Sequence, residues 1–200
     1  NPPYMGSKGM NPQVKDLATD YFPNSKADLF AMFIERAIAQ AAGSGRVGIV
    51  APYVWMFLSS YESFRDSIAG QTSISSLIQL EYNAFEPACI PVATFSLIRC
   101  PVNNLVGTYV KLSDFKGHQN QAPRTLEAIR DPKCGWLFKV TPEEFTKIPG
   151  HPIIYWLPRP CYDLFGSETS IGDEASVSEG IKTGDNQRFL RLWHEVNYQS

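Results

Sequence analysis

The apolar positions in the first part of the chain predict a helix followed by a buried strand. From residue 29 they recur three and four residues apart, at Leu29, Phe30, Phe33, Ile34, Ala37, Ile38 and Ala41. This spacing places them on one face of a helix. Ser25, with Asp28 three residues later, resembles a capping box at its start, and Gly43-Ser44-Gly45 ends it. The apolar run Val47–Ala51, stopped by Pro52, predicts a strand of a parallel sheet.

A second helix and three further strands follow in the pattern. Ser60 can cap a helix that closes at Gly70, and Ile74–Leu80 has the composition of a strand. Val92–Cys100 and Leu105–Leu112 are rich in β-formers, and the turn residues between them predict a hairpin. The order helix, strand, helix, strand, hairpin predicts an α/β fold with an antiparallel edge hairpin.

The periodicity weakens in the last part of the chain. A polar segment near Val14–Thr19 predicts a short helix earlier on, and Thr141-Pro142 predicts the start of a late one. Short strands are expected at Gly135–Val140 and Ile153–Leu157. We therefore expect a division of the chain into residues 1–112 and an α+β extension over residues 113–200.

Composition adds four points to this picture. The chain is 44% hydrophobic and 12% aromatic, which is enough for a packed core. Its formal net charge is −2, so a nucleic-acid partner would need local basic patches. The four cysteines form no C-x-x-C pair and the three histidines are scattered, which predicts no metal site and free thiols, as in the cytoplasm. No apolar run approaches the roughly 18–20 residues that a membrane-spanning helix needs.

The first four residues, Asn1-Pro2-Pro3-Tyr4, can form a cradle for a planar amino group. The Asn1 side-chain oxygen is an acceptor, and Pro2, which has no N–H, offers only its carbonyl in a stiff backbone. Tyr4 supplies a flat face for stacking. Two acceptors directed at one –NH₂ group would free its lone pair for attack, as methylation of an exocyclic amine requires.

Other interpretations of the same residues stay open at this point. Asn-Pro-Pro is typical of a turn, and N-P-x-Y is also a docking peptide for phosphotyrosine-binding-type domains. Gly43, Gly45 and Gly48 formally match a dinucleotide-binding pattern. That pattern requires a strand before the glycines and a helix after them, and here the predicted order is the reverse.

Several stretches resemble the N6-adenine DNA methyltransferases of the γ arrangement. The resembling stretches are Asn1-Pro2-Pro3-Tyr4, Asp28 to Ile38, Gly45 to Pro52, Trp55 to Leu58, and Phe85-Glu86-Pro87 leading into Pro91 to Phe95. More narrowly, the chain is similar to the PglX-type methyltransferases of BREX phage-defence systems in three further stretches: Met5 to Lys8, Ser25 to Phe30, and Thr183 to Phe189.

The resemblance implies a partial Rossmann-like, S-adenosylmethionine-dependent methyltransferase fold. Residues 1–112 would be the C-terminal part of the catalytic domain, and residues 113–200 would lead into a target-recognition region. The implied enzyme is a cytoplasmic, adenine-specific DNA methyltransferase of the restriction-modification or phage-defence type. It would act on double-stranded DNA, with other defence proteins as possible partners and with no metal and no membrane.

The resemblance also implies roles for individual residues. Asn1, Pro2, Pro3 and Tyr4 would be catalytic. Phe85 would pack against the flipped adenine. The candidates for contact with DNA are Lys8, Thr183, Gly184 and Asn186.

One departure from the family pattern limits these expectations. The glycine-rich cofactor loop, which lies upstream of the catalytic motif in the family, is absent from the chain, so we expect the 200 residues alone to be inactive. A protein-glutamine or RNA amine methyltransferase is the alternative enzyme, but the chain continues far beyond residue 112, where small glutamine methyltransferases end. A docking module without catalysis is the more distant alternative.

Overall fold

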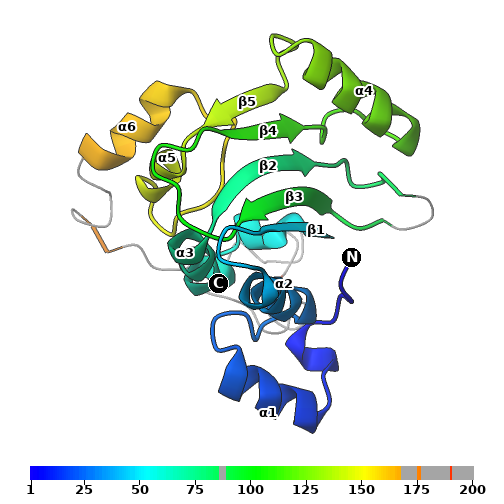
Figure 1. The fold of residues 1–200 in the computed structure, drawn as a ribbon, viewed down its shortest axis with the longest axis vertical. Helices are drawn as coiled ribbons and strands as arrows, with labels where there is room; N and C mark the ends of the chain where they lie inside the picture. Colours follow the sequence, from blue (N-terminus) through cyan, green and yellow to red (C-terminus); the bar gives the residue numbers. More distant parts are fainter. Residues whose placement is uncertain (86–88, 168–174, 177–189, 191–200) are drawn as a thin grey trace, which may run out of the picture. The chain divides into compact units, whose positions relative to one another are not determined.

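The computed structural model describes residues 1–85, 89–167, 175–176 and 190 (Figure 1). The chain divides into one compact unit, Asn1–Gly166, and a second unit, Ser167–Ser200. Almost all of the second unit lies outside the described residues, so the description below concerns the first. Within the described part of the chain, no helix is long and apolar enough to cross a membrane. The same residues contain no group of three or more His, Cys, Asp or Glu side chains that could hold a metal ion.

The compact unit is built on a five-stranded mixed sheet. Its strands are β1 (Arg46–Pro52), β2 (Ser73–Gln79), β3 (Val92–Ile98), β4 (Gly107–Lys111) and β5 (Leu137–Val140). Their order across the sheet is β1-β3-β2-β4-β5. β3 pairs antiparallel with both β1 and β2, β2 pairs parallel with β4, and β4 pairs antiparallel with β5. The predicted α/β class is therefore confirmed.

Helices cover and extend this sheet. They are α1 (Pro12–Tyr21), α2 (Leu29–Gln40), α3 (Glu62–Gln71), α4 (His118–Arg130), α5 (Pro142–Thr146) and α6 (Arg159–Ser167), with short 3₁₀ segments η1 (Ser7–Gly9), η2 (Tyr53–Met56) and η3 (Ser59–Tyr61). In Figure 1, α1 and α2 lie toward the β1 edge and α4 lies toward the opposite edge.

The helix predicted from the apolar spacing is α2, and its buried face is the predicted one. Phe30, Ile34 and Ile38, four residues apart, are buried against β1 and the centre of the sheet. The start of the helix differs from the prediction. Asp28, not Ser25, is the N-cap, because its carboxylate accepts from the Phe30 N–H at 3.2 Å. The buried Ser25 hydroxyl instead donates to Glu35 Oε2 at 2.7 Å.

The predicted hairpin between β3 and β4 is wrong. β2 lies between these two strands, and β3 forms its antiparallel ladders with β2 and β1. β1 is correspondingly not a member of a parallel pair. Ile74 and Leu77 of β2 are both buried, and a central position gives this apolar strand a partner on each side. Alternation along a sequence identifies a strand but does not specify which strand pairs with it.

Three smaller predictions from the sequence also need correction. Tyr61, with no side-chain capping bond, precedes α3, so Ser60 is not its cap. The segment Ile153–Leu157 forms no strand; the Ile153 N–H donates to the Met56 carbonyl at 2.9 Å and a turn follows. The helix α4 was not predicted, since it is polar and buries only Gln121 and Ala128. The predicted helices at Val14–Thr19 and Thr141-Pro142 are confirmed as α1 and α5.

A buried arginine ties two connecting segments to α3. Arg65 is only 4% exposed, and its guanidinium donates to the backbone carbonyls of Trp55 (2.8 Å), Leu58 (2.7 Å) and Gly150 (3.0 and 2.5 Å). Gly150 has a φ of +77°, a conformation that favours glycine. Burial lowers the pKa of Arg65, and the nearby Glu62 and Asp66 carboxylates act in the opposite direction. The guanidinium thus joins three carbonyls from separate connecting segments, of which Leu58 also accepts from the Tyr61 N–H at 3.1 Å.

Replacing Arg65 by methionine should destabilise the protein strongly. The substitution keeps much of the apolar stem but leaves the Trp55 and Gly150 carbonyls without a donor, whereas the Leu58 carbonyl keeps the Tyr61 N–H. We therefore expect a loss of about 3 kcal/mol in the free energy of unfolding. Urea titration of the full-length protein followed by tryptophan fluorescence measures it. The exposed Arg130, at the end of α4, is the matched control, and Arg130→Met should change stability by less than about 0.5 kcal/mol. Equal losses in the two variants would contradict this role.

The buried tyrosines should make the fold sensitive to alkaline pH. Burial raises the pKa of Tyr61 and of Tyr162 to about 12, with the charges of Asp28 and Glu144 as smaller causes, and it also raises the pKa of Tyr109 and Tyr155. An unfolded tyrosine loses its proton near pH 10. Stability should therefore be complete below pH about 10 and fall between pH 10 and 12, because only the unfolded chain ionises there. Unfolding midpoints measured across this range test it, and the double variant Tyr61→Phe, Tyr162→Phe should show a shallower fall.

Candidate functional site

The predicted catalytic tetrapeptide packs against the start of α2. The half-buried Tyr4 ring makes an edge contact with Phe30, with ring centroids 6.4 Å apart and an interplanar angle of 89°. Its hydroxyl donates to Asn1 Oδ1 at 2.5 Å. Burial raises the pKa of Tyr4 above its ordinary value. Asn1 and Pro3 are exposed, and Pro2 is half-buried.

Asp28 anchors the chain immediately after the tetrapeptide. One oxygen of its carboxylate, Oδ1, accepts from the Met5 N–H as well as from Phe30, each at 3.2 Å. The Leu29 N–H donates to the Met5 carbonyl at 3.0 Å, and Gly6 forms a β-bridge with Asp28. The same side chain therefore begins α2 and fixes the backbone that carries Asn1 and Tyr4.

Two acceptors of the tetrapeptide remain able to bind an external amine. An amide oxygen has two lone pairs, and the Tyr4 hydroxyl uses one of those on Asn1 Oδ1. The Pro2 carbonyl accepts no hydrogen bond from any described residue. The hydrogen bond from Tyr4 also restricts rotation of the Asn1 amide, so that its orientation is set by a ring packed on the core.

Phe85 follows β2 at the end of the sheet where β1 and β2 both finish; these two strands run in the same direction on either side of β3. The register pairs Pro52 with Val92 and Gln79 with Ala93, so both strands end beside the start of β3. Phe85 is on the loop between β2 and β3 and is 52% exposed. The N-terminus lies on the same side of the sheet in Figure 1. The carboxyl ends of strands are where open α/β sheets bind ligands. The structure records no direct contact between Phe85 and the tetrapeptide among the described residues.

The remaining predicted contacts are divided between two places. Lys8 is exposed on η1, four residues after Tyr4. Thr183, Gly184 and Asn186 lie outside the described residues.

The glycines among the described residues do not form a cofactor cradle. Gly43-Ser44-Gly45 joins the end of α2 to β1, and the Gly45 N–H donates to the Ala42 carbonyl at 2.8 Å in a tight turn. The predicted order of helix before strand is confirmed. Nowhere in the described ranges does a glycine-rich loop lead from the carboxyl end of a strand into a helix. The residues present therefore do not fit S-adenosylmethionine by themselves.

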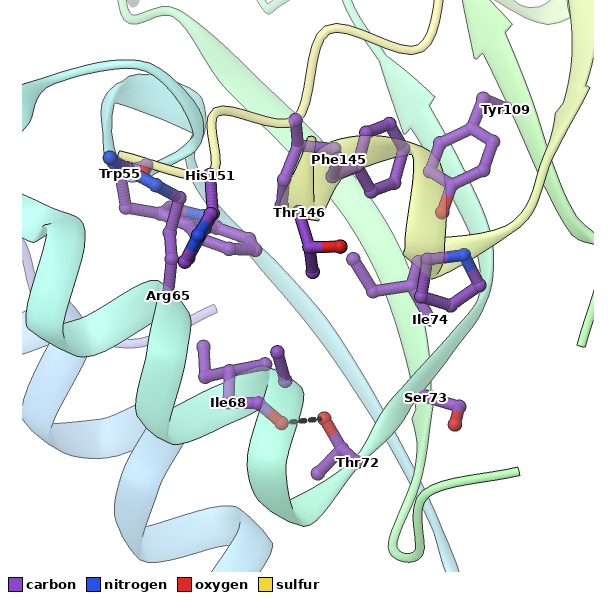
Figure 2. Close-up of a pocket in the computed structure, with 13 residues that line it drawn as sticks. Trp55, Arg65, Ile68, Thr72, Ser73, Ile74, Tyr109, Phe145, Thr146 and His151 are labelled. Atoms are coloured by element: carbon purple, nitrogen blue, oxygen red, sulfur yellow. Dashed lines mark hydrogen bonds between the residues drawn. The ribbon is translucent and has the colours of Figure 1, made fainter. Parts of the chain in front are cut away.

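A small cavity of about 60 Å³ lies apart from the tetrapeptide, under α3 and α5 (Figure 2). Its walls include Trp55, Ile68, Ile74, Tyr109 and Phe145, and none of the predicted site residues lines it. Trp55 Nε1 and the Tyr109 hydroxyl are buried and have no hydrogen-bond partner in the described part of the chain. Nothing in the sequence pattern indicated this cavity, because its walls come from five separate segments.

The fold is similar to that of restriction-modification enzymes of known structure. Residues 1–85 match the family model described as Eco57I restriction-modification methylase. A solved structure of the Type ISP restriction-modification enzyme LlaGI, a nuclease-deletion mutant in complex with a DNA substrate mimic, superposes with a TM-score of 0.56. It covers 77% of this chain and 15% of its own chain at 16% sequence identity, which shows a shared fold.

Two curated proteins are similar over the whole chain. The adenine-specific methyltransferase PglX of Lacticaseibacillus casei (strain Zhang) is 32% identical over 99% of the chain. The adenine-specific methyltransferase BrxX of Escherichia coli O9:H4 (strain HS) is 35% identical over 100% of it. The resemblance to PglX-type methyltransferases is therefore confirmed. The chain spans only 17% and 16% of the lengths of these relatives.

Removing the Asp28 carboxylate should release the tetrapeptide. We expect Asp28→Ala to cost about 1–2 kcal/mol of stability through the lost cap, and to speed amide exchange at Met5. Asp28→Asn keeps an acceptor oxygen and should have the smaller effect on both. Hydrogen exchange with mass spectrometry on the full-length protein measures it, with Asp131→Ala, at the end of α4, as the control. Unchanged exchange at Met5 in Asp28→Ala would contradict the anchor.

Proposed function

We propose that the whole protein is an enzyme that transfers a methyl group to the N6 amino group of adenine in DNA. The observation that carries this proposal is the hydrogen bond from the Tyr4 hydroxyl to Asn1 Oδ1, with the Tyr4 ring packed on Phe30. The similarity to proteins named adenine-specific methyltransferases supports the choice of adenine. The DNA substrate mimic bound by LlaGI, which shares the fold, supports DNA as the polymer that carries it.

The proposed substrate must leave the duplex before it can react. An N6 amino group inside stacked, paired DNA is out of reach of Asn1, so the adenine has to be flipped out at a cost of a few kcal/mol. Stacking on aromatic rings returns roughly 1–3 kcal/mol per base. We assign this role to the Tyr4 ring and to Phe85, whose exposed ring is available for the second face.

The chemistry at the amine then depends on hydrogen-bond acceptors. The open lone pair of Asn1 Oδ1 and the Pro2 carbonyl accept the two N6 hydrogens and direct the nitrogen lone pair away from the ring. Pro3 keeps the short segment stiff, since its φ is fixed. The step requires positioning and electrostatic stabilisation rather than a covalent enzyme intermediate.

S-adenosylmethionine is the proposed methyl donor. Because the described residues do not fit this cofactor, we assign its binding to another segment of the whole protein. Residues 1–166 would supply the amine-binding side of the site, and we expect them to transfer no methyl group alone.

The rest of the proposal concerns the wider protein. We propose that residues 1–112 contribute to catalysis and that residues 113–200 lead into a region that recognises the target sequence. Thr183, Gly184 and Asn186 are proposed to contact the DNA backbone there. A cytoplasmic phage-defence setting, with partner defence proteins, follows from the resemblance to PglX-type enzymes.

The competing functions are less well supported. A docking peptide of the N-P-x-Y type would need an accessible tyrosine, whereas Tyr4 is packed on Phe30 and hydrogen-bonded to Asn1. A protein-glutamine or RNA methyltransferase would use the same acceptors, and only the identity of the methylated product separates it from the leading proposal.

Substitutions at Asn1 and Tyr4 test the proposed roles. Asn1→Ala in the full-length protein removes an acceptor from the amine and should lower the methylation rate by about 100-fold or more. Tyr4→Phe keeps the ring but frees the Asn1 amide and should cost less, about tenfold. Tyr4→Ala loses both and should approach Asn1→Ala. N6-methyladenine in the DNA of cells that express each variant, measured by mass spectrometry, reports the outcome.

Tyr21→Phe is the matched control, because Tyr21 is exposed on α1 and should leave methylation unchanged. Methylation at the normal rate in Asn1→Ala would refute the assigned chemistry. Transfer of label from S-adenosylmethionine to protein or RNA, but not to DNA, would favour the alternative enzyme.

A further inference from the structure

An open groove of about 500 Å³ lies directly beyond the tetrapeptide along the chain. It is lined by Ser7, Lys8, Met10, Lys15, Ala18, Thr19, Lys26 and Ala27. These residues come from three separate segments: η1, α1 and the connection between α1 and α2. The connection is held to η1 by the hydrogen bond from the Ser7 N–H to the Ala27 carbonyl, at 3.0 Å.

Three lysines converge on this groove and no acidic side chain lines it. Lys8, Lys15 and Lys26 are all exposed, and none forms an ion pair with a described residue. The formal net charge of the whole chain is −2, and exposed Asp16 and Asp20 lie on α1, but the residues that line the groove carry three ammonium groups and no carboxylate. Such a surface attracts a polyanion.

The floor of the groove is apolar and fixed in place. Met10 and Ala18 are buried and pack with Met32 of α2 in a small core cluster. Lysine stems can lie along an apolar floor while their ammonium groups stay in water. Two hydroxyl-bearing residues, Ser7 and Thr19, also line the groove, and hydroxyls are common partners of phosphate oxygens.

The groove is within reach of the nucleotide next to a flipped base. Ser7 follows Tyr4 by three residues, and a chain extends at most about 3.6 Å per residue, so their backbones are within about 11 Å. Each DNA strand carries one phosphate per about 3.4 Å of helix axis. The distance from Tyr4 to the groove is therefore short enough for phosphates of the same strand, within a few nucleotides of a base stacked on Tyr4, to reach it.

We propose that this groove seats the sugar–phosphate backbone beside the flipped adenine, with Lys8, Lys15 and Lys26 neutralising successive phosphates. The inference rests on the proposed function and names the surface by which that site holds its substrate. Phosphate contacts fix register without reading sequence, and an extruded nucleotide needs its neighbours held in place. The lysines do not touch the reacting amine, so they act on binding rather than on the chemical step.

The test uses the full-length protein with Lys8, Lys15 and Lys26 all changed to glutamine. Binding to a labelled DNA duplex is measured by fluorescence anisotropy between 50 and 200 mM salt. The slope of log K against log salt is negative, and each lost phosphate contact reduces its magnitude by about 0.9. The magnitude should therefore decrease by about two to three in this variant. Affinity at 100 mM salt should drop at least tenfold. The KM for DNA should rise while kcat at saturating DNA stays within about twofold.

A triple variant at Lys116, Lys133 and Lys139, also changed to glutamine, is the matched control. These exposed lysines lie between β4 and the end of β5, and their substitution removes the same amount of charge as the groove variant. They precede the proposed backbone contacts at Thr183, Gly184 and Asn186, and no phosphate contact is assigned to them, so the slope should stay unchanged. Thermal unfolding of both triple variants should match that of the wild type, because all six side chains are exposed.

The outcomes separate this inference from the function on which it rests. An unchanged salt slope in the groove variant, or an equal fall in the control, overturns the groove as a phosphate site even if the protein methylates adenine. A fall confined to the groove variant supports the groove. If that fall occurs in a protein that never methylates DNA, the groove stands as a nucleic-acid surface and the proposed function fails.

Discussion

The candidate site depends on one carboxylate. Asp28 Oδ1 accepts from the first helical N–H groups at Phe30 and from the Met5 N–H, so a helix start and a loop anchor share a single acceptor. The negative charge also lies at the N-terminus of α2, where the helix dipole favours it. The Tyr4 ring packs against Phe30, two residues after Asp28, and the Tyr4 hydroxyl donates to Asn1. The position of Asn1 therefore depends on the position of α2.

A second polar group performs a comparable task on the other side of the core. The Arg65 guanidinium joins η2, the segment before η3 and the turn at Gly150, which are short connecting segments. Asp28 and Arg65 each hold such connecting backbone through side-chain hydrogen bonds. The sheet supplies the rigid frame between them, and these two side chains attach the irregular segments to it.

Local patterns in the sequence are enough to predict several elements of the fold. The spacing of Phe30, Ile34 and Ile38 identified α2 and its buried face, and the tetrapeptide pointed to the methyltransferase resemblance. The sequence does not decide between Ser25 and Asp28 as the cap, because both are good capping residues; in the structure Asp28 accepts from Phe30 and Met5, and the Ser25 hydroxyl donates to Glu35. The place of β2 between β3 and β4 is a long-range choice that no local pattern records.

The three lysines of the groove could likewise not be grouped from the sequence. Lys8 and Lys26 can be noticed one by one, but an exposed lysine is ordinarily just solvated. Lys15 belongs with them only because α1 folds back against η1, which the sequence does not reveal. The three lysines form a candidate phosphate-binding surface only because the fold brings these separate positions to one groove.

The contacts of β4 with later parts of the chain limit where the protein can be shortened, because β4 pairs with β5. Tyr109 of β4 stacks on Tyr155 with ring centroids 4.9 Å apart and packs edge-on against Phe145. A product ending at residue 112 would strip both rings from Tyr109 and turn β4 into a bare outer strand in place of a central one. Such a shortened product should self-associate and precipitate, so any attempt to produce the front portion separately has to extend at least through the turn that carries Tyr155.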